Sequence, residues 1–347
     1  MLTLTEEHSI INGDGTVLFY SADHFLRDIV DGNHCFICGA KPGSVAFNDE
    51  HVIPDWILRR YGLHAQKITL PGGSELAYGQ YKVPCCETCN SNLGKVFEEP
   101  ISELFSKGYS AIVTELTERN PLRLFAWMNL IFLKTHLKDR TLLVNRDRRV
   151  QSPRISELYD WPELHHIHCV SRMFHTGVSY SPTALGSLFI WPAKTGSELG
   201  DFDYGDYYPG RAMFLRLGEV FILCVLNDAN AALCSLDWLI HDIAGPLSPV
   251  QCRELLARFA DANIRLKNRP QFYTEVGKAG DGLLISANVP KHIEQEPFVA
   301  PRFGEVLYSA LGSLVTAIPF PEPETAREHI RQGRWTFLFD SDGKFLR

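Results

Sequence analysis

Residues 35–38 read CFIC, residues 48–54 read NDEHVIP, and residues 83–99 read VPCCETCNSNLGKVFEE. Together they contain two Cys-x-x-Cys pairs on either side of an adjacent Glu-His pair, and an Asn follows the last Cys directly. Four thiolates at this spacing suit one tetrahedral zinc ion. The expected ligands of this structural zinc are Cys35, Cys38, Cys86 and Cys89. A pairing of Cys85 with Cys89 would be an unusual Cys-x-x-x-Cys, so the interpretation takes Cys86 with Cys89.

The composition of the chain is that of a globular protein. Its 347 residues are 45% hydrophobic and 22% charged, which allows a sizeable core and two or three domains. The net charge is −7, so any nucleic-acid contact must use local positive charge and should weaken with salt. Nine cysteines, four of them in metal-type pairs, fit a reducing cytoplasm better than a disulfide scaffold. Neither a signal peptide nor a membrane span is expected.

Local patterns around the cysteines predict a small mixed module. Residues 44–47 and 79–83 read as short strands, and residues 55–61 as a short helix. Thr88 or Asn90 can cap a longer helix that runs to about Lys107. The prediction is therefore two strands joined by a long loop, followed by a helix, with zinc at the base.

This arrangement resembles the HNH nucleases of the His-Me finger (ββα-metal) group, and most of all the branch that carries zinc. The resemblance covers residues 35–105 and rests on Cys-x-x-Cys, then Glu-His-Val-Ile-Pro at 50–54, then Cys-x-x-Cys-Asn with Gly and Glu further along the helix. It implies an endonuclease that hydrolyses phosphodiester bonds of DNA, with RNA as an alternative substrate. It also implies a second, catalytic divalent ion, Mg²⁺ or Mn²⁺, and a context of anti-phage defence or a mobile element.

The resemblance assigns roles to residues of the motif. His51 is the expected general base, because a neutral imidazole can take the proton of a water near pH 7. Glu50 and Asn90 are the expected ligands of the divalent ion, which prefers oxygen. Glu98, eight positions after Asn90, can be a further ligand, the partner of a ligand, or an exposed charge. Neighbouring residues of a strand point to opposite faces, so Glu50 and His51 can serve one site only if the chain bends there.

Two features depart from the family pattern. Many members carry an Asn in the loop that orients the base, and no Asn lies between His51 and Cys89. His64, Gln80 or a backbone carbonyl could take that role. Many members also have Asp where this chain has Glu50.

Positive charge is concentrated in two places. Arg59 and Arg60 lie on the predicted short helix and can contact phosphate or simply face solvent. The densest basic stretch contains only Asp139 and Asp147 as opposing charges, and it is the candidate DNA-backbone surface. Its basic members are Lys134, Lys138, Arg140, Arg146, Arg148, Arg149 and Arg154.

The rest of the chain predicts a larger domain of unknown fold. Residues 122–138 are apolar nearly all round and should form a helix central to that domain. Four segments read as strands: residues 164–170, 184–191, 212–217 and 220–226. Residues 200–210 read as an exposed loop, and residues 249–268 as an amphipathic helix. The expectation is an α+β protein with a nuclease domain and N-terminal extension over 1–108. An α+β domain over 109–347 would serve substrate binding, regulation or assembly into a homo-oligomer.

Two other functions fit the same residues. A non-catalytic zinc module that binds nucleic acid or protein predicts no effect of His51→Ala and unfolding on Cys86→Ser. An RNA-cleaving toxin shares the site and differs only in its substrate.

Overall fold

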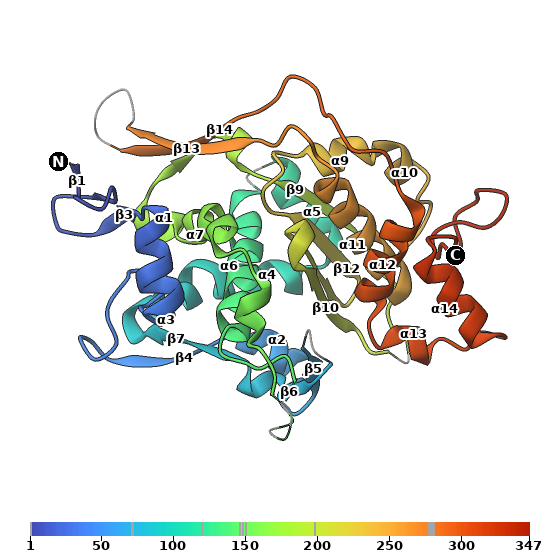
Figure 1. The fold of residues 1–347 in the computed structure, drawn as a ribbon. Coiled ribbons are helices and arrows are strands. Elements are labelled where there is room, and N and C mark those ends of the chain that lie inside the picture. Colours follow the sequence, from blue (N-terminus) through green and yellow to red (C-terminus); the bar gives the residue numbers. More distant parts are fainter. Residues whose placement is uncertain are drawn as a thin grey trace. The chain divides into compact units, whose positions relative to one another are not determined.

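The computed structural model describes residues 2–70, 73–118, 121–145, 147, 149, 151–197, 199–276 and 282–347. It is a mixed α+β structure, as expected (Figure 1). The chain forms two compact units. Unit 1 contains residues 1–107, 114–180 and 274–285, and unit 2 contains residues 108–113, 181–273 and 286–347. The expected single boundary at residue 108 is therefore wrong, because most of the next 70 residues pack with the N-terminal part.

Unit 1 is built from short elements around one long helix. Its strands are β1 (Thr3–Leu4), β2 (Ile10–Ile11), β3 (Val17–Phe19), β4 (Phe47–His51), β5 (Lys67–Thr69), β6 (Glu75–Ala77), β7 (Lys82–Cys86) and β8 (Ser179–Tyr180). Its α-helices are α1 (Ala22–His24), α2 (Asp55–Arg60), α3 (Glu87–Leu93), α4 (Glu99–Ser106), α6 (Leu122–Asp139), α7 (His165–Ser171) and α8 (Met173–Thr176). Irregular helical segments are η1 (Phe25–Asp31), η2 (Tyr78–Gln80), η3 (Gly94–Glu98), η4 (Ile155–Leu158) and η5 (Trp161–Leu164).

The cysteine-containing region folds as two antiparallel strands followed by a helix. β4 pairs with β7 so that Glu50 lies opposite Val83 and His51 opposite Lys82. β7 leads directly into α3, and η3 and α4 extend the helical path to Ser106. η3 is a π-helical segment, in which each turn contains more residues than in an α-helix. The order of strand, loop, strand and helix agrees with the sequence prediction.

The long apolar helix belongs to unit 1. α6 begins after Pro121 and is buried almost throughout, as its sequence indicates. It contacts β7 and α7, so the two-stranded region packs against this helix. The expectation that it would be central to a separate C-terminal domain is wrong.

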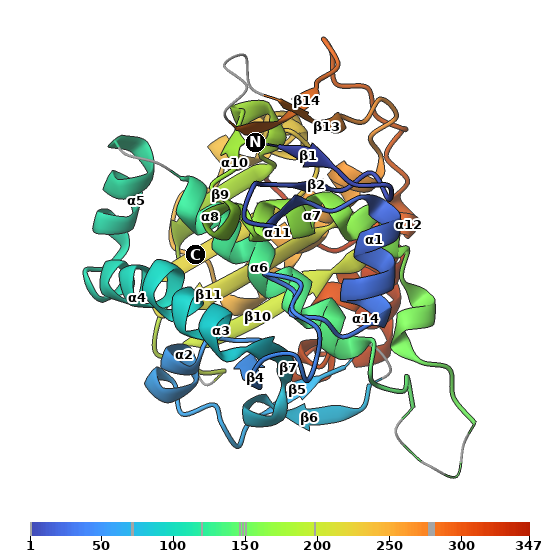
Figure 2. The same ribbon diagram turned by 90° about the vertical axis from the view of Figure 1, so that its left-hand side faces the viewer.

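Unit 2 is an antiparallel sheet covered by helices. The strands β9 (Ser187–Pro192), β10 (Phe202–Tyr207), β11 (Ala212–Leu217) and β12 (Val220–Val225) are arranged in the order β10-β11-β12-β9. Its helical elements are α9 (Ala231–Ser235), α10 (Asp237–His241), α11 (Pro249–Ile264), α12 (Ala300–Leu311), α13 (Leu314–Ala317), α14 (Pro323–Arg331), η6 (Pro182–Ala184) and η7 (Tyr208–Gly210). Figure 2 shows the yellow strands of the sheet side by side; α11 contacts β10, β11 and β12, and the helix and the sheet share one large core.

Three elements include residues of both units. α5 (Tyr109–Glu118) begins in unit 2 and ends in unit 1. β13 (Gln271–Val276) and β14 (Leu283–Asn288) belong to a three-stranded sheet in the order β13-β14-β8. Within unit 1, β14 pairs in parallel with β8. No helix among the described residues has both the length and the apolar character needed to cross a bilayer.

Two segments differ from their predicted structure. Residues 165–171 form helix α7 rather than a strand, because buried Leu164, Ile167 and Ser171 follow a helical period. Residues 202–207 form edge strand β10 rather than a loop, in full register with β11. Gly205 permits this pairing, since a Cβ there would lie 2.6 Å from the ring of Phe214. In both segments tertiary packing overrides a weak local pattern.

Candidate functional site

The four expected zinc ligands come together. Cys35 and Cys38 lie in the turn before β4, Cys86 ends β7, and Cys89 lies in the first turn of α3. Their sulfur atoms all lie within 4.8 Å of one another, and we call them the four-cysteine group. Backbone N–H groups face the sulfurs: Ala40 donates to Cys38 Sγ and Cys89 donates to Cys86 Sγ, both at 3.4 Å. This group could bind a metal ion such as zinc.

Cys85 is a fifth thiol beside this group. Successive residues of a strand point to opposite faces, so Cys85 and Cys86 leave β7 on different sides. Cys85 Sγ lies 3.7 Å from Cys35 Sγ, whereas Cys86 Sγ lies 3.6 Å from Cys38 Sγ. The set of four mutually close sulfurs contains Cys86 and not Cys85. The geometry therefore favours the Cys-x-x-Cys interpretation.

Helix α7 anchors the first cysteine turn. The guanidinium of Arg172 follows this helix, is fully buried, and donates to the carbonyls of Ile37 and Val17. His168 Nε2 is 3.0 Å from the carbonyl of Phe36. These contacts fix two successive carbonyls between Cys35 and Cys38. They give α7 a structural role that the sequence did not indicate.

Glu50 is held by a buried lysine. Lys134 Nζ, on α6, donates to Glu50 Oε1 at 2.6 Å and to the carbonyl of His51 at 2.7 Å. Lys134 is 1% exposed and Glu50 is 6% exposed. The assignment of Lys134 to a nucleic-acid-binding surface is therefore wrong, since a phosphate cannot reach its ammonium. This ammonium neutralises the carboxylate that was expected to bind a divalent ion.

Glu98 is partly buried beside Glu50 and Lys134. It ends the π-helical segment η3, and burial raises its pKa to about 7, while the nearby charge of Lys134 acts in the opposite direction. The charge of Glu50 also contributes to the raised pKa. Two carboxyl groups thus share the surroundings of one ammonium.

Asn90 lies on the exposed side of this region. Its amide nitrogen donates to Asn48 Oδ1 at 2.7 Å. Asn48 precedes Glu50 by two residues and is therefore on the same face of β4. The side chains of Asn90 and Glu50 thus lie over the same strand face, but their hydrogen-bond partners differ.

His51 faces a different set of side chains. β4 continues through His51, so the chain does not make the bend that would bring Glu50 and His51 to one site. His51 Nδ1 lies 4.0 Å from Asp55 Oδ1, and the ring meets that of His64 edge to face with centroids 6.1 Å apart. His64 Nε2 is 2.9 Å from the same Asp55 oxygen. Burial lowers the pKa of His51, and Lys82 adds to this effect while Asp55 and Glu50 oppose it.

A hollow with basic side chains in its lining lies along β4 and β7, and His51 is not among its lining residues. It measures about 280 Å³, and its lining includes Lys82, Lys138 and Arg140, with Asp49 as an opposing charge. A second hollow of about 410 Å³ shares Arg140 with the first and adds Arg154, with Asp31 as an opposing charge. Lys82 is the cross-strand partner of His51. The hollows therefore extend positive charge away from His51.

No protein-family model, curated protein or solved structure matches this chain. The site must therefore be interpreted from its own geometry.

The other expected phosphate contacts have different surroundings. Arg59 is 78% exposed and pairs with Asp55 Oδ2 at 2.6 Å. Arg60 is exposed, with its guanidinium 5.8 Å from the ring centre of Tyr61. Arg149 is exposed and pairs with Asp147 at 2.6 Å. The predictions for Arg146 and Arg148 fall outside the described residues.

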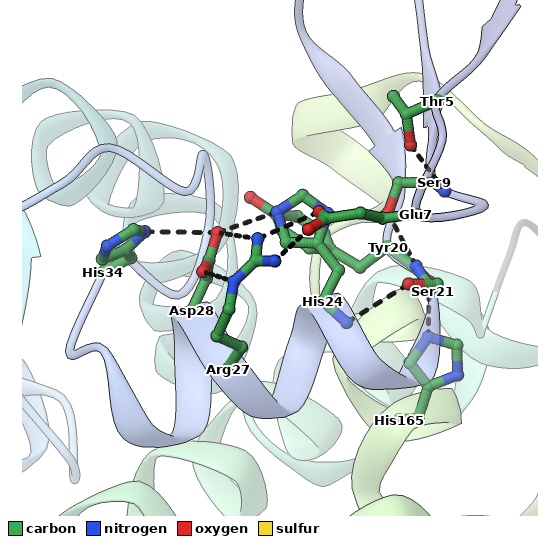
Figure 3. Close-up of polar contacts among 10 residues, drawn as sticks. All are labelled: Thr5, Glu7, Ser9, Tyr20, Ser21, His24, Arg27, Asp28, His34 and His165. Atoms are coloured by element: carbon green, nitrogen blue, oxygen red, sulfur yellow. Dashed lines mark hydrogen bonds and ion pairs between the residues drawn. The ribbon is translucent and has the colours of Figure 1, made fainter.

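A Ser-His-Asp contact chain near the N-terminus has the residue types of a hydrolase triad (Figure 3). His24 Nδ1 is 2.7 Å from Ser9 Oγ, and its Nε2 is 2.8 Å from Asp28 Oδ2. Ser9 is fully buried and its oxygen accepts the N–H of Ser21. A substrate cannot reach that hydroxyl, so the contacts fix the N-terminal strands on α1 rather than form a nucleophile.

Sequence reasoning did not include Asp55 or Lys82 in the site. Asp55 stands four residues after His51 at the start of α2, and that spacing on a turn was an available signal. His64 was considered only as an orienting group. Lys82 carried no signal, because its place opposite His51 depends on the register of β4 and β7.

Proposed function

We propose that this protein is an HNH-type endonuclease that hydrolyses phosphodiester bonds of DNA, with His51 as the general base. The observation that carries the proposal is the position of His51. It ends the first strand of a strand–loop–strand–helix region whose helix begins within the four-cysteine group. The imidazole is half-buried, and Lys82, opposite His51 in the strand pair, lines a hollow with basic side chains that can accept a phosphate backbone.

The chain's own residues account for proton transfer. Because burial lowers its pKa, the imidazole of His51 is largely neutral at pH 7 and can accept the proton of an attacking water. The water oxygen forms a bond to phosphorus as the bond to the leaving oxygen breaks, and the leaving oxygen takes up a proton from solvent. The carboxylate of Asp55, 4.0 Å from Nδ1, stabilises the imidazolium that forms. Lys134 fixes the backbone carbonyl of His51 and hence the end of β4.

Structural zinc has a consistent place in this proposal. The thiolates of the four-cysteine group would hold Zn²⁺ and thereby join the turn at residues 35–38 to the end of β7 and the start of α3. The ion would supply rigidity rather than chemistry, because four cysteine ligands leave no open coordination position.

The contacts of this structure do not fit the expected Mg²⁺ or Mn²⁺ ligand set. Glu50 is neutralised by Lys134. Glu98, with a pKa of about 7, is in part protonated near neutral pH. A divalent ion at these residues would have to displace a buried ammonium, so no catalytic step is assigned to one.

Plasmid nicking by the full chain tests the proposal. Wild type, His51→Ala and the control His241→Ala would be assayed with EDTA, Mg²⁺ or Mn²⁺, with zinc content measured in each. His241 is an exposed histidine of unit 2 with an aspartate four residues before it, so His241→Ala removes the same kind of side chain as His51→Ala at a position outside the site. Cleavage by wild type and the control, lost in His51→Ala with zinc unchanged, is the expected result. Equal cleavage by all three proteins would refute the role of His51.

The buried Glu50–Lys134 pair favours one rival function, a zinc module that binds nucleic acid without cleaving it. This rival predicts no nicking in any buffer, together with salt-sensitive DNA binding that weakens in Lys138→Ala and Arg140→Ala. Parallel assays on RNA and on single-stranded DNA separate a DNA nuclease from an RNA-cleaving toxin.

A further inference from the structure

We propose that His51, Asp55 and His64 form a second metal site, which binds a divalent transition-metal ion of the Zn²⁺ class and thereby blocks His51 as a base. The inhibitory consequence rests on the proposed function, whereas the binding itself does not. The site is separate from the four-cysteine group and uses none of Glu50, Asn90 or Glu98.

The ligand atoms are already gathered. One oxygen or nitrogen from each of the three side chains lies within 4.8 Å of the others. Metal–ligand bonds of about 2.1 Å place adjacent ligand atoms about 3.0–3.4 Å apart. The 2.9 Å between His64 Nε2 and Asp55 Oδ1 lies just below this range, so these two atoms would move slightly apart on binding an ion. The 4.0 Å between His51 Nδ1 and the same oxygen requires a side-chain movement of under about 1 Å.

The backbone holds two of these side chains in place. Asp55 is the first residue of α2, and Arg59 on the next turn binds its other oxygen, which orients the carboxylate. The carbonyl of His64 accepts the N–H of Gly79 at 3.1 Å. A Cβ at Gly79 would lie 3.0 Å from that carbonyl, so the close approach suits glycine. The loop that carries His64 is thereby fixed against η2.

The donor set selects the ion. Two imidazole nitrogens and one carboxylate oxygen suit Zn²⁺, Co²⁺ and Ni²⁺, whereas Mg²⁺ prefers oxygen ligands alone. The side chains of His51, Asp55 and His64 are 20%, 27% and 46% exposed, so an ion can enter from solvent. A neutral imidazole has one nitrogen lone pair, so an ion bound at Nδ1 of His51 would leave Nε2 protonated and unable to accept a proton. Metal binding and general-base action therefore exclude each other.

Metal stoichiometry on the full chain tests the site without any activity. Protein that retains its tightly bound zinc would be titrated with Co²⁺ and then Zn²⁺, following the visible absorption of Co²⁺ and the heat of binding. We expect wild type to bind one additional equivalent of Co²⁺, and the absorption spectrum of the bound Co²⁺ should lack the sulfur-to-cobalt charge-transfer band of a thiolate site. Asp55→Asn and His64→Ala should lose this equivalent and keep their original zinc. His241→Ala, the matched control, should bind like wild type.

Two outcomes would overturn the site. One is the absence of an additional equivalent in wild type, and the other is its retention in both Asp55→Asn and His64→Ala. Where nicking is observed, added Zn²⁺ should slow nicking by wild type severalfold. The ratio of the nicking rates without and with added Zn²⁺ should approach one in His64→Ala. Binding without any change in the nicking rate would refute the inhibitory role alone. Absence of nicking in every protein would refute the proposed function and leave the stoichiometry decisive for the site.

Discussion

Replacing Lys134 with methionine removes the charge that neutralises Glu50 and keeps most of the buried aliphatic stem. The variant leaves Glu50, 6% exposed, without its ammonium partner, and it frees the carbonyl of His51. At the observed 2.6 Å and an effective dielectric constant of about 20, the lost attraction is about 6 kcal/mol. The desolvation cost of the ammonium offsets part of this loss. We therefore expect Lys134→Met to destabilise unit 1 by about 3–5 kcal/mol.

A second substitution separates lost charge from lost packing. Glu50→Gln combined with Lys134→Met removes both charges, and the double variant should recover to within about 2 kcal/mol of wild type. Lys107→Met serves as the control, because Lys107 pairs with Glu103 at 2.7 Å in solvent. That exposed pair should contribute nothing measurable.

Amide hydrogen exchange followed by mass spectrometry measures these changes separately in each unit. Peptides from β4 and α6 should lose protection in Lys134→Met, whereas peptides from β11 and β12 should not change. A loss below about 1 kcal/mol, or a double variant as unstable as the single one, would refute the account of Glu50 as a buried carboxylate that depends on Lys134.

Three further predictions concern the four-cysteine group, Glu98 and the buried Asp228 of unit 2. Cys86→Ser should release the expected zinc and increase amide hydrogen exchange in unit 1, whereas Cys85→Ser should retain one zinc per chain. Metal analysis of the two purified variants tests this, and it would show the opposite result if Cys85 were the ligand. Burial raises the pKa of Glu98 from its ordinary value of 4.5 to about 7, so the folded state holds a proton that the unfolded chain releases. Stability should then be fully present below pH 4.5 and fall by up to about 3 kcal/mol as the pH rises through 7, and Glu98→Gln should flatten this slope in urea titrations at several pH values. Asp228→Ala should destabilise unit 2 by about 2–4 kcal/mol in hydrogen-exchange experiments. The reason is that the buried carboxylate accepts hydrogen bonds from the backbone N–H and hydroxyl of Ser187 and from the backbone N–H of Ala232. A smaller loss would mean that water replaces the carboxylate.

The sequence alone determined the features whose signals are local. The spacing of Cys35, Cys38, Cys86 and Cys89 identified the group of four sulfurs, since Cys-x-x-Cys turns bring their thiols together wherever they occur. Apolar residues on all sides of 122–138 identified α6 to within one residue. Short apolar runs identified β11 and β12, which are buried on both faces. These patterns depend on neighbours in the chain.

The partners of the site residues depended on tertiary structure. The basic stretch from Lys134 to Arg154 has one local composition, yet burial of α6 turns Lys134 toward Glu50 while Lys138 and Arg140 line a hollow. Position on a buried helix, and not charge, decided which of them meets solvent. No local pattern specifies which face of a helix a distant strand will cover.

The surroundings of His51 show the same division. Its identity as a candidate base came from the sequence Glu-His-Val-Ile-Pro. Its contact with Asp55 depends on the turn after β4, and its contact with His64 depends on the loop that Gly79 fixes. Its pairing with Lys82 depends on the register of β4 and β7. Side chains far apart in the chain acquire their chemistry from packing, because pKa, access and ligand geometry are set by what lies within a few ångströms.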